Sequence, residues 1–391
     1  MFDSTLIVHA GRDPAAFQGV VNTPVFRAST VLAPTIADWD RRKRERAAEA
    51  PGTYYGRHGT PTAHGFQDAM AALEGGYRTL VFPSGLAACA FAILPFVQSG
   101  DHVLITDSAY DPTRRLAAGV LKRFGVSSDF YDPLIGAGIE ALITPRTRLV
   151  YTESPGSHTF EMQDTARIVE AAHRRGAVVA MDNTWATPLY FKPLEHGVDI
   201  SVQAATKYIV GHSDAMLGTV TVNKDLWPQL KSTAYDLGQI AGPDDCYMAQ
   251  RGLRTLAVRL KQHWDSGMQM AQWLARQPEV ERVLHPALPG DPGHSIWQRE
   301  FKGASGLFSV IMKPMAARAL AALIDDLQLF GIGASWGGYE SLVLPIEPAG
   351  HRSVTTWPHH GPAFRMHVGL EDVRDLIADM EQGFARLRAA L

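Results

Sequence analysis

The sequence predicts an α/β protein whose mostly parallel sheet is flanked by helices, with a smaller α+β region after it. From about residue 60 onward, short apolar segments alternate with helical segments, which is typical of repeated βα units. The apolar segments lack an alternating polar face, as expected for strands that are covered on both sides. The 391 residues exceed the usual size of one hydrophobic core, so two domains are expected.

Five short apolar segments rich in β-branched residues predict the strands of this sheet. They cover residues 79–82, 102–106, 148–152, 177–181 and 198–204. Parallel strands need long crossover connections, and the stretches between these segments are long enough to hold helices.

Helical periodicity with clear stop signals predicts the helices. Gly75-Gly76 and Gly176 would each end a helix, because glycine readily adopts the left-handed conformation found there. The predicted helices cover residues 62–73, 86–96, 165–175, 255–276 and 371–391.

The chain is expected to have three parts. The change in pattern after Tyr247 places the end of the large α/β domain near residue 250. We therefore predict an N-terminal arm over residues 1–58, an α/β domain over residues 59–250 and an α+β domain over residues 251–391.

Composition and charge exclude several functions. With 37 basic and 40 acidic residues, the chain has no excess charge to attract nucleic acid or an anionic membrane. Two cysteines form no disulfide framework and favour a reducing cytoplasm. The start of the chain resembles no signal peptide, and the apolar run over residues 86–97 is too short to span a membrane. The charged residues 40–46 include interleaved acids and predict a solvated helix rather than a nucleic-acid patch.

Lys207 is the strongest single indication of function. It comes just after the predicted strand 198–204, and reactive groups in an open parallel sheet lie beyond the carboxyl ends of the strands. A desolvated lysine in that place is a nucleophile that forms Schiff bases. The alternative is that Lys207 is an ordinary surface cation.

Three other strand ends carry residues that fit the same chemistry. Ser84-Gly85 opens a helix whose first N–H groups suit a phosphate. Tyr110 offers a ring for stacking, and Asp182 offers a carboxylate for a protonated ring nitrogen. Each has a structural alternative: a simple turn, loop packing and a helix cap, respectively. Together with Lys207 they form the set expected around pyridoxal phosphate (PLP).

Other kinds of site are not expected. Gly136-Ala137-Gly138 lacks a third glycine and follows no strand, so it does not predict dinucleotide binding. His359-His360 has no carboxylate or cysteine at ligand spacing, so no metal site is expected. Cys89 lies in an apolar helix and is expected to be inert core.

Several motifs resemble the Cys/Met-metabolism family of fold-type-I PLP-dependent enzymes, and the resemblance runs from Thr5 to the C-terminus. It implies a fold-type-I PLP-dependent transferase fold with a seven-stranded, mostly parallel sheet. Residues 203–218, 335–341 and 365–372 point to the β-eliminating branch of the family. The matching motifs are Tyr55-Gly56-Arg57, Ser84-Gly85, Ala109-Tyr110-Asp111-Pro112, Met181-Asp182-Asn183-Thr184-Trp185 and Thr206-Lys207-Tyr208.

The resemblance implies a role for each cofactor-binding residue. Lys207 would bind the cofactor covalently and transfer protons, while Asp182 would keep the pyridine nitrogen protonated. Tyr110 would stack on the ring and help to activate the incoming substrate amine. The backbone N–H groups of Gly85 and Leu86 would hold the phosphate.

The remaining implied roles concern the phosphate, the substrate and the neighbouring subunit. The Thr206 hydroxyl would also bind the phosphate, and Tyr55 and Arg57 would reach it from a neighbouring subunit. Arg365 would hold the substrate α-carboxylate through two parallel hydrogen bonds. Ser335 and Trp336 would line the same end of the pocket. The resemblance thus implies a homotetramer built as a dimer of active dimers.

Two departures from the family pattern bear on the reaction. Ala204 stands where many relatives have a serine that binds the phosphate, which implies one lost hydrogen bond. Pro112 follows the stacking tyrosine, and no cysteine lies in the segment where γ-lyases acting on methionine typically have one. This difference favours β-elimination.

The implied reaction is cleavage of L-cystathionine to L-homocysteine, pyruvate and ammonia in methionine biosynthesis by transsulfuration. Cysteine- and cystine-type S-conjugates are further expected substrates. The alternative within the family is a γ-synthase or γ-lyase. A different class of function is a PLP-binding regulatory protein with little turnover.

Overall fold

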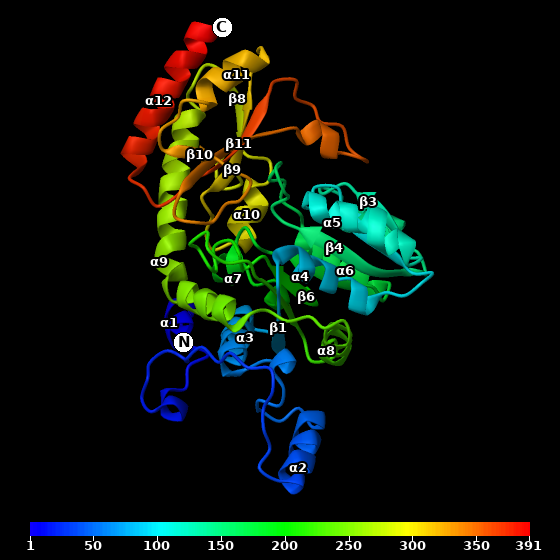
Figure 1. The fold of residues 1–391 in the computed structure, drawn as a ribbon. Coiled ribbons are helices and arrows are strands. Elements are labelled where there is room, and N and C mark those ends of the chain that lie inside the picture. The colour runs from blue at the N-terminus through cyan, green and yellow to red at the C-terminus, as the bar shows by residue number, and fades with distance from the viewer.

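A computed structural model describes residues 1–391, and two β-sheets organise the chain (Figure 1). The larger sheet has seven strands and the smaller has five. The helix α9 (Pro243–Leu274) runs for 32 residues along the molecule and joins the two regions (Figure 1). None of the helices combines the length and the hydropathy needed to cross a bilayer.

The larger sheet is mostly parallel, as predicted. Its strand order is β1-β7-β6-β5-β4-β2-β3, and β7 alone runs antiparallel to its neighbours β1 and β6. The central strands are buried along their whole length or nearly so. The strands are β1 (Arg78–Phe82), β2 (His102–Thr106), β3 (Ser127–Tyr131), β4 (Thr147–Glu153), β5 (Val178–Asp182), β6 (Ile200–Gln203) and β7 (Gly218–Val222).

Two strands of this sheet were not predicted from the sequence. β3 lies at the edge and reads Ser-Ser-Asp-Phe-Tyr, so polar residues hide its strand character. β7 is fully buried but begins with glycine and contains two threonines. The short, polar composition of both explains why an apolar pattern did not reveal them.

The helices that cover this sheet follow the predicted stop signals, with one correction. Gly75 has φ +70° after α3, and Gly176 has φ +75° after α6. The predicted helix 86–96 is wrong in its second half, because α4 ends at Phe91 and Pro95 permits only a short 3₁₀ turn after it. The helices are α3 (Pro61–Glu74), α4 (Gly85–Phe91), α5 (Asp111–Leu116), α6 (Thr165–Arg174), α7 (Thr187–Tyr190) and α8 (Trp227–Asp236).

The smaller sheet has the strand order β10-β11-β12-β9-β8 and is mixed, because β10 alone runs parallel to its neighbour. α9 begins twelve residues before the predicted start at 255, since Pro243 is well placed in the first helical turn. The elements are β8 (Val280–Leu284), α10 (His294–Glu300), β9 (Leu307–Met312), α11 (Ala317–Ile324), β10 (Phe330–Ile332), β11 (Ser341–Ile346), β12 (Ala363–His367) and α12 (Val373–Ala390).

The first 58 residues contain two helices, α1 (Asp3–His9) and α2 (Ile36–Ala47). α1 contacts α9 and α3, whereas α2 projects away from the rest of the chain (Figure 1). The charged run 40–46 lies in α2 and forms ion pairs within the helix, such as Arg41 with Glu45, as the solvated-helix prediction requires. The domain boundaries at residues 58 and 250 stay predictions, and the second falls inside α9.

Candidate active site

A cavity of about 350 Å³ lies at the carboxyl ends of β4, β5 and β6, where the loop 334–336 and β12 of the smaller sheet meet them. Its position follows from the parallel sheet, because strands that run in one direction bring their carboxyl ends to one edge. Predicted site residues among its lining are Gly85, Leu86, Tyr110, Asp182, Thr206, Lys207, Trp336 and Arg365.

Lys207 lies in the turn that follows β6, where its backbone N–H donates to Ala204 O at 2.9 Å. Its Nζ donates to Ser335 Oγ at 2.8 Å and lies 5.2 Å from the centre of the Trp336 ring. Burial, helped by the positive charge of Arg365, lowers the pKa of Lys207 to about 8. Near physiological pH the neutral fraction of this amine is therefore far larger than that of an ordinary lysine, as a nucleophile or base requires.

Asp182 ends β5 with its side chain directed into the same cavity. Thr184 donates to its Oδ1 from both the backbone N–H (3.0 Å) and the hydroxyl (2.5 Å), and Cys89 Sγ donates to Oδ2 at 3.6 Å. Burial raises the pKa of Asp182, although the bonds from Thr184 oppose the shift. Asp182 is not a helix cap, because α7 begins only at Thr187.

Thr184 and Cys89 have functions that the sequence did not reveal. The Thr184 hydroxyl accepts the N–H of Ala204 at 2.8 Å, so it ties the end of β5 to the turn that carries Lys207. Cys89 is buried as predicted, but it lines the cavity and contacts Asp182 as well as packing in the core. Burial and the charge of Asp182 raise the pKa of the Cys89 thiol well above its usual value, so it remains protonated.

The start of α4 lies at the cavity, and its binding of a phosphate stays a prediction. Ser84 caps the helix by accepting the N–H of Ala87 at 3.1 Å, and the first N–H groups of a helix have no intrahelical partner. A Cβ atom on Gly85 would lie 2.5 Å from the Cβ of Ala204. Glycine is thus required at position 85 because the turn before Lys207 approaches it closely.

Thr206 has partners within the protein in addition to its predicted role at the phosphate. Its hydroxyl donates to Leu217 O at 3.1 Å and accepts the N–H of Leu217 at 2.9 Å. These bonds fix the turn after β6 to the start of β7. Binding of the phosphate by the Thr206 hydroxyl stays a prediction.

Arg365 reaches the cavity from β12. Its Nη2 donates to the carbonyl oxygens of Ala334 at 2.9 Å and Ser335 at 3.3 Å. Burial lowers the pKa of Arg365 to about 10, so it stays charged at neutral pH. The same loop approaches the backbone of Lys207 closely at Gly337, which has φ +86°. A Cβ atom on Gly337 would lie 2.9 Å from Lys207 C.

Glu153 and His158 line the cavity and were missed in the sequence. Glu153 ends β4 and pairs in register with Asp182, so the strand-end rule that selected Asp182 would have selected it too. Its Oε2 accepts the N–H of Tyr110 at 2.7 Å. Burial and the charge of Asp182 raise the pKa of Glu153 well above its usual value. His158 has its pKa lowered to about 4 by burial and the charge of Arg365.

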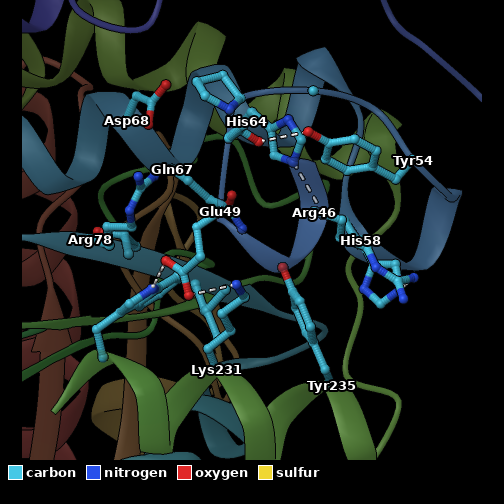
Figure 2. A pocket seen from close by; sticks show the side chains of 16 residues that line it. Arg46, Glu49, Tyr54, His58, His64, Gln67, Asp68, Arg78, Lys231 and Tyr235 are labelled. Atoms are coloured by element: carbon cyan, nitrogen blue, oxygen red, sulfur yellow. Dashed lines mark hydrogen bonds and ion pairs between the residues drawn. The ribbon is translucent and has the colours of Figure 1, made fainter. Parts of the chain in front are cut away.

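Tyr55 and Arg57 do not line this cavity. Arg57 Nη1 donates to Tyr235 O on α8 at 3.1 Å, and its guanidinium lies 5.7 Å from the centre of the Tyr55 ring. A second, polar pocket of about 180 Å³ lies between the arm, α3, β1 and α8 (Figure 2). Its lining includes His58, which contacts Tyr55, and Tyr235, which contacts Arg57. There Glu49 pairs with Lys231 at 2.7 Å (Figure 2), which fastens the arm to α8.

His359 contacts a carboxylate that is distant in the sequence. The sequence placed no carboxylate near it, but Glu281 Oε1 on β8 lies 2.6 Å from His359 Nδ1. The contact joins residues 78 positions apart, so local spacing could not predict it. No group of three or more His, Cys, Asp or Glu side chains is arranged to hold a metal ion.

Residues 4–385 match the family described as "Cys/Met metabolism PLP-dependent enzyme". The chain is 50% identical over 390 residues to a putative cystathionine beta-lyase of Rhizobium johnstonii, covering 99% of this chain and 96% of the relative. It is 46% identical over 389 residues to cystathionine beta-lyase MetC of Escherichia coli strain K12, covering 98% of each.

A solved structure agrees with the sequence comparison. Cystathionine gamma-lyase from Lactobacillus plantarum, complexed with L-serine, superposes with a TM-score of 0.90 and is 30% identical. The match covers 99% of this chain and 100% of that structure's chain. The fold-type-I architecture predicted from the motifs is thereby confirmed.

Proposed function

The chain belongs to the Cys/Met metabolism family of PLP-dependent enzymes, and we propose that it is a carbon–sulfur β-lyase acting on L-cystathionine. The products are L-homocysteine, pyruvate and ammonia, with one water consumed, and the reaction serves methionine biosynthesis. The observation that carries the proposal is the buried amine of Lys207 in one cavity with Asp182 and Arg365. The 46–50% identity to relatives named cystathionine beta-lyase supports this choice of reaction.

The residues of the cavity fit PLP. Asp182 is a buried carboxylate with an acceptor oxygen for a ring N–H. Gly85 has no side chain and lines the cavity at the start of α4, where a phosphate would lie. Lys207 supplies the amine that holds the cofactor, and Tyr110 supplies a half-exposed ring beside it. When bound, PLP supplies an electron sink that makes the substrate Cα–H acidic and allows the β-substituent to leave.

Lys207 is the base and acid of the proposed reaction. With a pKa of about 8, its amine takes a proton from Cα and returns one to the departing sulfur at accessible pH. The hydrogen bond to Ser335 Oγ restrains the position of Nζ. The Trp336 ring lies 5.2 Å from the amine in the same cavity.

Arg365 holds the α-carboxylate of the substrate. The carbonyl oxygens of Ala334 and Ser335 bind Nη2 and orient the guanidinium plane, so the remaining N–H groups can make a two-point contact with a carboxylate. Trp336 lines this end of the cavity, and Ser335 accepts a hydrogen bond from Lys207 beside it. A substrate held by its carboxylate at Arg365 would present its Cα to Lys207.

The arm completes the site of a neighbouring subunit. Tyr55 and Arg57 lie outside the cavity of their own chain, and the Tyr55 side chain is 41% exposed. We propose that both reach the phosphate site of a second copy, with residues 1–58 as the exchanging arm. The domains 59–250 and 251–391, the homotetramer and a cytoplasmic location remain parts of the same proposal.

γ-Elimination is the second candidate, because the similar solved structure is named a cystathionine gamma-lyase. The 2-oxo acid formed from L-cystathionine distinguishes the candidates: a β-lyase gives pyruvate and a γ-lyase gives 2-oxobutyrate. We expect pyruvate as the main product, with none formed by Lys207→Ala. 2-Oxobutyrate as the main product would replace the β-lyase proposal, and the absence of both acids would favour a regulatory PLP-binding protein.

A further inference from the structure

Glu153 lines the cavity and contacts the backbone of Tyr110. It ends β4 beside Asp182 in register, and its Oε2 accepts the backbone N–H of Tyr110 at 2.7 Å. Tyr110 is the residue immediately before α5, where a backbone N–H has no helical partner of its own. The contact therefore joins β4 to the start of α5 across 43 residues of sequence.

The two carboxyl groups differ in how many donors they receive. Asp182 receives two hydrogen bonds from Thr184 and one from Cys89, whereas Glu153 receives one, from Tyr110. Donors stabilise the ionised form, and neighbouring buried carboxyl groups resist a second charge. The donors therefore favour a negative charge on Asp182 over one on Glu153, in agreement with the strongly raised pKa of Glu153.

The ring of Tyr110 depends on this anchor. Tyr110 is 44% exposed, so packing alone leaves the ring partly unrestrained. The ring projects from a backbone that Glu153 holds at its N–H and the N–H groups of Thr113 and Arg114 hold at its carbonyl oxygen. A neutral carboxyl group provides the anchor without adding a charge that would compete with Asp182.

We infer that Glu153 is a positioning residue, which holds the backbone of Tyr110 and so orients the Tyr110 ring in the cavity. This inference deepens the proposed function, because Tyr110 is the residue expected to stack on the cofactor. It assigns to Glu153 a part in the site that acts through another residue, without contact to the reacting atoms. Glu153→Gln would keep an uncharged acceptor oxygen for the Tyr110 N–H, whereas Glu153→Ala would remove the acceptor.

Hydrogen–deuterium exchange of the holoenzyme tests the contact directly. Glu153→Ala should accelerate exchange at the Tyr110 amide about tenfold, the value of roughly one hydrogen bond, and Glu153→Gln should do so less. Asp379→Ala is the matched control, because Asp379 is a buried carboxyl group that accepts the N–H groups of Gln328 and Leu329 in the smaller domain. It should accelerate exchange at those two amides and leave Tyr110 unchanged.

Visible circular dichroism of bound PLP tests the consequence for the ring. Glu153→Ala should change this signal in the wild-type background and add no further change to Tyr110→Ala, because no ring remains to be oriented. Glu153→Asp, whose shorter side chain withdraws from the amide, should show the same changes more weakly and serves if Glu153→Ala does not fold.

Two results would overturn the inference: unaltered exchange at Tyr110 in Glu153→Ala and Glu153→Asp, or an equal dichroism change with and without the Tyr110 ring. Wild-type protein that binds no PLP would instead contradict the proposed function. The exchange measurement would still report on the contact between Glu153 and Tyr110, so the two failures are distinguishable.

Discussion

The cavity and the N-terminal arm hold their predicted residues in different ways. Lys207 and Asp182 lie at the ends of buried strands. Lys207 donates a hydrogen bond to Ser335, and Asp182 accepts one from Thr184. Tyr55 and Arg57 lie on the arm, where Arg57 contacts α8 and the intervening Gly56 contacts Ser29. Lys207 and Asp182 thus meet in one cavity of the same chain, whereas Tyr55 and Arg57 lie outside that cavity.

This difference shows what strand-end reasoning can find. A parallel sheet brings the ends of its strands together within one chain, so a residue after one strand is near a residue after the next. A residue that acts in a second subunit obeys no such rule, and only the motif resemblance pointed to Tyr55 and Arg57.

Replacement of Lys207 by alanine should have the largest effect. The protein loses the amine that holds PLP and transfers protons, so we expect no measurable pyruvate from L-cystathionine and loss of the visible band of the bound cofactor. Absorbance spectra and an assay for 2-oxo acids measure both. Pyruvate formation at the wild-type rate would show that another residue is the base.

Arg365→Ala should lower kcat/KM for L-cystathionine about 10- to 100-fold, because hydrogen bonds to charged groups contribute roughly 1.5–3 kcal/mol. Most of the loss should appear in KM, since the contact is made in the ground state as well. Arg365→Lys should recover only part of it, because an ammonium group cannot make the planar two-point contact. An unchanged KM would place the carboxylate elsewhere.

Arg57→Ala tests the arm. We expect retention of PLP to weaken about tenfold, which is the lower end of the value of a hydrogen bond to a charged group. Mixing this variant with Lys207→Ala under conditions of subunit exchange should restore about one site in four, the share with both native residues in a symmetric dimer. No recovery after demonstrated exchange would mean that Arg57 acts within its own chain.

Replacement of Asp107 should have the smallest effect, because we expect it to change the stability of the fold and not the reaction. Burial disfavours its charge, but bonds from Ser353, Val354 and Arg114 outweigh burial and lower its pKa to about 2. A carboxyl group with a lowered folded-state pKa stabilises the fold above its unfolded pKa of about 4. This contribution is lost as pH falls through the folded-state value.

Asp107→Asn should therefore destabilise the protein at pH 7 and change its stability little near pH 2. Denaturant unfolding at several pH values measures the difference. Equal destabilisation at both pH values would show that the charge of Asp107 does not matter.

The sequence alone predicted the strands that carry the site, because each is apolar and followed by a residue with a distinct chemical role. Lys207, Asp182 and Tyr110 could be selected without the structure. β3 and β7 were missed because their polar residues resemble loops.

Contacts between distant segments were the main limit. Glu153 follows the predicted strand 148–152 as Asp182 follows the predicted strand 177–181, so the strand-end rule could have found it. Its contact with Tyr110 joins residues 43 positions apart and could not be predicted. Thr184 and Cys89 acquire their roles only once β5, β6 and α4 pack together. The bond between Lys207 and Ser335 joins residues 128 positions apart, so no local pattern encodes it.

Chemical labelling can test directly whether Lys207 is the lysine that binds PLP. Borohydride reduction of the holoenzyme fixes the cofactor to its amine, and mass spectrometry of the digested protein identifies the modified residue. Lys207 follows β6 in the cavity that Asp182 and Arg365 share, so we predict the label on the peptide that contains Lys207. A label on another lysine, with Lys207 unmodified, would contradict the account.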